Sequence, residues 1–94
     1  MNANISVGPI SSSEFRVTIS ENATRSSHRV TLQREDYDRL TAGKVAPEEL
    51  VRMSFEFLLE REPKESILSR FDLMVIARYF PAFEREMNRR LSQS

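Results

Sequence analysis

The sequence predicts a single α+β domain, in which an N-terminal antiparallel β-hairpin packs on three to four C-terminal helices. Two short segments alternate apolar and polar residues, which is the period of a half-buried strand. Residues 47–61 instead repeat apolar side chains at helical spacing. The length of 94 residues fits one domain, and the absence of cysteine excludes disulfides and thiolate metal sites.

The first residues predict no regular structure. Gly8-Pro9 is a turn signal, and three serines follow it at positions 11–13. We therefore expect residues 1–13 to form a flexible N-terminal arm. The single α+β domain then extends over residues 14–92.

The two predicted strands are residues 14–20 and 28–32. In the first, Phe15, Val17 and Ile19 point to one face. In the second, Val30 and Leu32 do so. The polar residues 21–27 between them predict a loose hairpin loop, because parallel strands would need a longer crossover.

Helices are expected over 35–40, 47–61, 73–79 and 81–91, with a helical turn within 64–70. Pro47 suits the first turn of a helix, and Glu48 and Glu49 suit the positive end of its dipole. Gly43 fits the left-handed position that follows a helix. Asp72 is expected to cap the helix beginning at residue 73.

The helix over residues 47–61 is too apolar for an ordinary surface helix. Its charged residues fall in one stripe about 80° wide, and apolar residues fill most of the remaining circumference. It is therefore either the central helix of the domain or part of a subunit interface. The interface alternative assigns a protein-binding surface to Leu50, Met53, Phe57 and Leu59.

Residue patterns argue against catalysis. His28 is the one histidine, no nucleophilic serine motif or phosphate-binding loop is present, and the paired carboxylates alternate with basic residues as on solvated helix faces. We expect a non-enzyme with no catalytic residues, no bound cofactor and no metal. Fourteen basic and fourteen acidic residues give zero net charge, which disfavours general nucleic-acid binding but allows a local basic patch.

No export signal is recognisable, and no apolar run approaches the roughly 18–20 residues of a membrane span. A cytoplasmic protein without membrane association is therefore expected.

The segment Arg29-Val30-Thr31-Leu32, followed by residues 35–40, Gly43 and 47–61, has the order strand, helix, turn, helix. In this order it resembles ribbon-helix-helix DNA-binding regulators and antitoxins. The resemblance implies that strands of two subunits pair and enter the major groove, with Arg29 and Thr31 facing the bases. The chain departs from the family in its short first helix, its additional preceding strand and its zero net charge.

The C-terminal half resembles a different group. The similarity to a family of small bacterial proteins of unassigned function lies in Pro47-Glu48-Glu49-Leu50-Val51, the run from Phe55 to Leu68, Arg70-Phe71-Asp72-Leu73 and the residues from Ile76 to Pro81. This resemblance implies a bacterial, cytoplasmic protein and assigns no activity to it.

Two functions follow from the sequence. The first is a non-catalytic protein-binding or adaptor module of a bacterial cell, which acts on another protein or as a homodimer. The alternative is a DNA-binding regulator or antitoxin of the ribbon-helix-helix kind.

Overall fold

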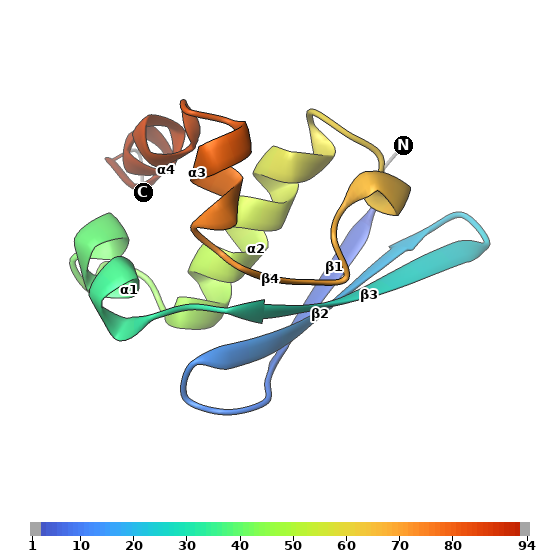
Figure 1. The fold of residues 1–94 in the computed structure, drawn as a ribbon, viewed down its shortest axis with the longest axis horizontal. Coiled ribbons are helices and arrows are strands. Elements are labelled where there is room, and N and C mark those ends of the chain that lie inside the picture. The colour runs from blue at the N-terminus through green and yellow to red at the C-terminus, as the bar shows by residue number, and fades with distance from the viewer. Residues whose placement is uncertain (1–2, 93–94) are drawn as a thin grey trace.

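A computed structural model describes residues 3–92, which form one four-stranded sheet and four α-helices gathered on one side of it (Figure 1). The fold is α+β, as predicted. The sheet has four strands in the order β1-β2-β3-β4, however, where the sequence predicts a two-stranded hairpin.

The predicted hairpin is present and longer than expected. Strands β2 (Glu14–Glu21) and β3 (Thr24–Thr31) pair antiparallel over their whole length. The expected loop over 21–27 is instead a tight turn, because Asn22 adopts the left-handed conformation with φ of 57°. Asparagine tolerates this conformation better than most residues.

The prediction of a flexible arm over residues 1–13 is wrong for its described part. Residues 4–9 form β1 (Asn4–Pro9), which pairs antiparallel with β2 and places Ile5 beside Ile19 and Val7 beside Val17. The serine run is the turn between the two strands, closed by the backbone N–H of Ile10, which donates to the Glu14 carbonyl at 2.8 Å. A proline is tolerated here because β1 is an edge strand. Met1 and Asn2 lie outside the described residues.

The segment expected as a helical turn within 64–70 also differs. It holds a short 3-10 helix, η1 (Lys64–Ser66), and then β4 (Arg70–Asp72), which pairs parallel with Arg29–Thr31 of β3. Asp72 ends the strand, and its carboxylate accepts a hydrogen bond from the Met74 N–H at 2.9 Å. That carboxylate therefore caps the turn before α3 (Val75–Tyr79), which begins two residues later than predicted.

The remaining helices lie close to their predicted positions. They are α1 (Arg34–Thr41), α2 (Pro47–Leu59) and α4 (Phe83–Ser92). Helix α1 ends with Ala42 and Gly43 in left-handed conformation, at φ of 51° and 77°. Only glycine adopts this conformation without strain, so Gly43 stands where the sequence predicts a helix end.

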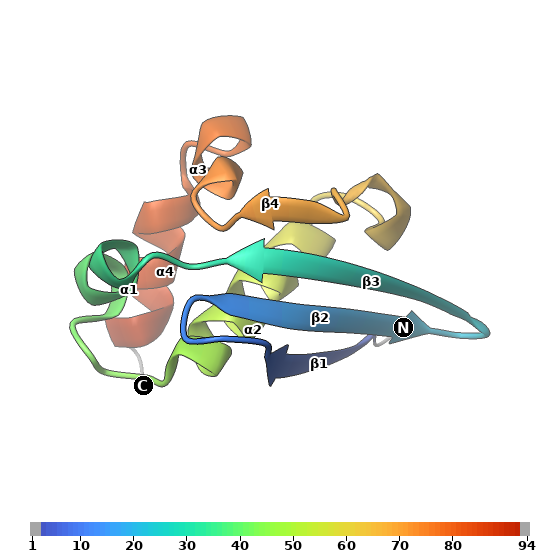
Figure 2. The same ribbon diagram turned by 60° about the horizontal axis from the view of Figure 1, so that its bottom comes forward.

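Helix α2 is the centre of the core. It crosses one face of the sheet, and α1, α3 and α4 complete the same layer, whereas the other face is open (Figure 2). The inward side chains of the strands meet its apolar residues, and Phe83, Met87 and Leu91 of α4 are buried on its far side. The Phe57 ring contacts the rings of Phe80 and Phe83, with centroids 5.9 and 5.3 Å apart.

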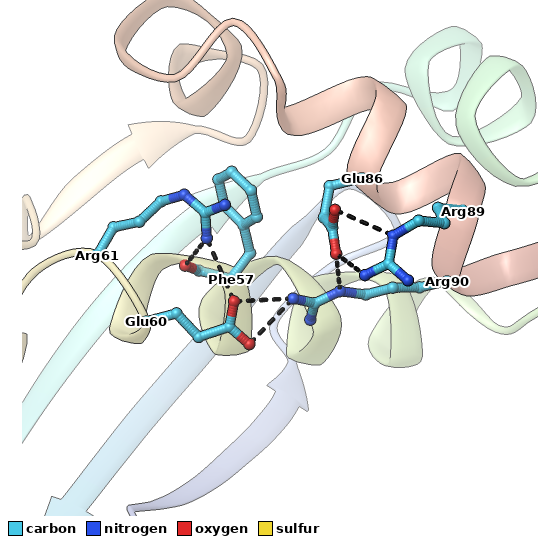
Figure 3. Close-up of polar contacts among 6 residues, drawn as sticks. All are labelled: Phe57, Glu60, Arg61, Glu86, Arg89 and Arg90. Atoms are coloured by element: carbon cyan, nitrogen blue, oxygen red, sulfur yellow. Dashed lines mark hydrogen bonds and ion pairs between the residues drawn. The ribbon is translucent and has the colours of Figure 1, made fainter.

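Ion pairs hold α4 to the end of α2 (Figure 3). Arg90 donates to both carboxylate oxygens of Glu60 at 2.9 and 3.0 Å and to Glu86 at 3.0 Å. Arg89 also donates to Glu86. On the other side of Glu60, the Arg61 guanidinium lies 3.7 Å from the centroid of the Phe57 ring. Two basic residues of α4, Arg89 and Arg90, thus form ion pairs within the chain.

The Arg89 and Arg90 guanidiniums, through their hydrogen bonds, lower the pKa of Glu86 from 4.5 to about 2. We predict that Arg89→Gln raises the pKa of Glu86 towards 4.5, measured by carbon NMR of the side-chain carboxyl during an acid titration. Because the pKa is lower in the folded than in the unfolded chain, these contacts stabilise the fold fully above pH of about 4.5, and that contribution is lost as the pH falls towards about 2.

Arg85→Gln is the matched control, because Arg85 is exposed on the same helix and has no ion pair within the described residues. An unchanged pKa of Glu86 in Arg89→Gln would contradict the assignment.

Candidate functional site

The interface predicted on α2 is not accessible. Leu50 and Phe57 are fully buried, Met53 is buried, and Leu59 is half-buried against the core. The correction has a physical reason: the sheet covers one side of α2, and helices of the same chain cover the other. Of the two alternatives drawn from the sequence, the central helix describes α2, and its apolar arc requires no second subunit.

The residues predicted to contact DNA lie on the open face of the sheet, but not in a free strand. Over Arg29–Thr31, β3 pairs with β2 on one side and β4 on the other. No edge is left there for a partner's strand, which the ribbon-helix-helix arrangement requires. Arg29 Nε lies 3.2 Å from the Glu14 carboxylate, and the Thr31 hydroxyl donates to Asp72 at 3.1 Å.

An apolar groove lies instead between α3, the end of α2 and the segment from η1 to β4. Three large apolar side chains of the described residues are exposed, and two of them, Leu68 at 50% and Tyr79 at 70%, line this groove. Its volume is about 280 Å³. The other lining residues are Leu58, Glu62, Ser66, Ile67, Phe71, Val75, Ile76 and Phe80.

His28 fixes one wall of the groove. Its imidazole is buried at 3% exposure, and its Nδ1 lies 2.7 Å from the Leu68 carbonyl oxygen. A carbonyl only accepts, so Nδ1 carries the hydrogen, and Nε2 then meets the Ser26 hydroxyl at 2.9 Å. The ring also packs against Phe55, with centroids 5.6 Å apart. His28 is thereby a structural residue that links β3 to the segment carrying Leu68.

The groove borders β4, which is an edge strand of the sheet. The Ser69 carbonyl accepts from the Arg29 N–H, and the Leu73 N–H donates to the Thr31 carbonyl, both at 2.8 Å. In a parallel ladder alternate residues face the neighbouring strand, so the backbone groups of Arg70 and Asp72 point away from β3. Figure 2 shows this edge open between α3 and the η1 segment.

A second, larger hollow of about 770 Å³ lies between β1 and the end of α2. Its buried Lys64 Nζ lies 2.7 Å from Glu65 and 3.6 Å from Glu21. The hydrogen bond with Glu65 raises the pKa of Lys64 and lowers the pKa of Glu65. These charges are satisfied by one another, so this hollow offers weaker support for a binding site than the apolar groove.

Sequence reasoning missed the groove for identifiable reasons. Tyr79 has the spacing of a buried helical residue, yet it is the most exposed of the large apolar side chains. Val75 and Phe80, apolar residues in or next to the predicted helix over 73–79, are half-buried along the groove. Leu68 was expected in a helical turn. One local signal of non-helical structure is present in this segment. Pro63 is followed by apolar residues that do not repeat at helical spacing.

The chain matches no protein-family model, and no curated protein or solved structure is significantly similar to it. Within residues 3–92, no helix is long and apolar enough to span a bilayer. In the same range no three histidine, cysteine or acidic side chains come together as metal ligands.

We predict that His28→Phe destabilises the fold by about 1–3 kcal/mol, because the Leu68 carbonyl loses its buried donor. Ser26→Ala removes only the partner of Nε2 and should cost less, about 0.5–1.5 kcal/mol. Urea unfolding monitored by circular dichroism measures both. If His28→Phe were as stable as the original chain, the link between β3 and the groove wall would be energetically unimportant.

Proposed function

We propose that this chain is a non-catalytic protein-binding module that holds an extended peptide in the apolar groove beside β4. The observation that carries the proposal is the meeting of Leu68 and Tyr79 at one hollow. Exposed apolar side chains scattered singly are normal on a small protein, whereas a cluster around a concave surface is typical of an interaction site.

The size of the groove sets what it can take. A volume of about 280 Å³ is at the low end for a small-molecule pocket and suits one or two apolar side chains. The polar groups of the lining come from Glu62, Ser66 and the Tyr79 hydroxyl, which do not form an acid–base pair with a nucleophile. Anchoring of a side chain is therefore favoured over chemistry.

The open edge of β4 supplies the second contact. Outward-facing backbone groups of Arg70 and Asp72 can pair with a strand added to the sheet, which is a common mode of peptide recognition. The backbone hydrogen bonds would give affinity, and the groove would select an apolar side chain. Because β4 has three residues, the added strand must also be short.

An exposed positive charge beside the groove indicates which residues should flank the apolar anchor of the peptide. Arg78 precedes Tyr79 on α3, is exposed, and has no ion pair within the described residues. An acidic residue beside the apolar anchor would complement it.

The partner we propose is another protein rather than a second copy, because the buried residues of α2 leave no large apolar face to share. The bacterial cytoplasm is the setting that the sequence resemblance implies.

The proposal is tested by selecting peptides from a random displayed library on the immobilised chain. Enriched peptides should share an apolar residue and bind at least tenfold more weakly to Leu68→Ala and Tyr79→Ala, since each removes one side of the groove. Ile10→Ala is the matched control, because Ile10 is 40% exposed but lies away from the groove, in the turn between β1 and β2. Nitrogen NMR shifts of the Arg70–Asp72 amides locate the bound peptide.

Equal binding to all three variants, or shifts confined to other strands, would place the interaction elsewhere. Sedimentation of the unmodified chain separates self-association from peptide binding, because a dimer through the groove would be lost in Tyr79→Ala.

A further inference from the structure

The open face of the sheet carries an ordered arrangement of charge. The strand registers place Arg16 beside Arg29 and Arg29 beside Arg70. These three side chains share the outward face, because the alternate residues Phe15, Val17 and Val30 face the core. They form a row across β2, β3 and β4, called here the arginine row.

The arginine row is only partly neutralised. Neighbouring strands are about 4.8 Å apart, and like charges directly opposite each other destabilise a sheet. Arg29 forms an ion pair with Glu14, whose carboxylate lies 3.2 Å from its Nε, and Asp72 lies on the same face opposite Thr31. Arg16 and Arg70 are exposed and have no ion pair among residues 3–92.

Hydroxyl groups lie beside the arginine row. A second row, made of Ser6, Thr18 and Ser27, lies two residues further along the strands, about 6.7 Å from the arginine row. Arg25 stands one further step along β3 and is also exposed. The helices lie behind the sheet in Figure 2, so no described element covers these rows.

We propose that this face binds the phosphate groups of a nucleic-acid backbone. Guanidinium and hydroxyl groups are the usual donors to phosphate oxygens, and arginine binds them bidentately. The two rows contain no aromatic side chain for stacking on bases. Contacts to phosphates carry no sequence information, so the proposed binding is independent of sequence. The zero net charge of the chain does not oppose this, because Arg16, Arg25, Arg29 and Arg70 come together on this face.

This site is distinct from the ribbon-helix-helix mode and from the groove. It needs no strand from a second subunit, and it uses the outward face of the sheet rather than the wall of α3. Its failure would leave the peptide-binding proposal intact, and the reverse also holds.

The test is fluorescence anisotropy of a labelled DNA duplex titrated with the full chain. Three neutralised phosphates give a slope of about −2.7 for log affinity against log salt, or roughly a 40-fold loss between roughly 50 and 200 mM salt. Arg16→Gln and Arg70→Gln should each reduce the slope by about one. A second duplex of unrelated sequence should bind equally.

Two further variants sharpen the result. Glu14→Gln should strengthen binding, because it removes the carboxylate that competes for Arg29, and a merely damaged fold would not gain affinity. Arg85→Gln, an exposed arginine of the helical layer, should bind as the original chain does. Circular dichroism confirms that each variant is folded.

Absence of binding at roughly 50 mM salt would overturn the proposal. So would equal binding by Arg16→Gln, Arg70→Gln and Arg85→Gln. Displacement of the duplex by polyglutamate as readily as by unlabelled DNA would also overturn it, because the face would then recognise an acidic protein.

Discussion

Burial of α2 is the constraint on which the other elements depend. A helix that is apolar around most of its circumference must be covered on at least two sides, and each side is built from a different part of the chain. The sheet supplies Val17, Ile19 and Val30, and α4 supplies Phe83 and Met87, all of them fully buried. The charged side of α2 remains exposed, and Glu60, directly after the helix, forms an ion pair with Arg90.

This division explains where binding surfaces are left. The face of the sheet turned away from α2 packs against no other element, and its side chains include arginines and hydroxyl residues. The groove arises where the covering of α2 is incomplete, between α3 and the η1 segment. One surface is charged and the other apolar, and they border different sides of the same strand, β4.

Local patterns predicted the elements that depend on neighbours in sequence. The alternation of Phe15, Val17 and Ile19 was enough for β2, and the apolar arc was enough for α2. Strand β1 was missed because Gly8-Pro9 suggests a break, although an edge strand tolerates both residues. Strand β4 was missed because three residues give no period and its pairing with β3 is not local.

The candidate sites were less predictable than the fold. The Leu68 carbonyl is bound by His28, 40 residues earlier in the chain, and no local pattern encodes such a contact. The residues Arg16 and Arg29 could be placed opposite each other once the hairpin was known, but Arg70 joins them only through β4. The choice between a central helix and an interface likewise depends on what covers α2, which sequence alone does not specify.

The connection between β3 and β4 links the two proposed surfaces to completion of the fold. Its contacts join residues 40 and 41 positions apart, His28 with Leu68 and Thr31 with Asp72. Closing so long a segment costs chain entropy, which the packing of the intervening elements, α2 among them, has to offset. Both proposed surfaces include β4 and are therefore complete only in the finished molecule. A ligand at either surface would discriminate against partly folded chains, and binding would itself act as a check on completed folding.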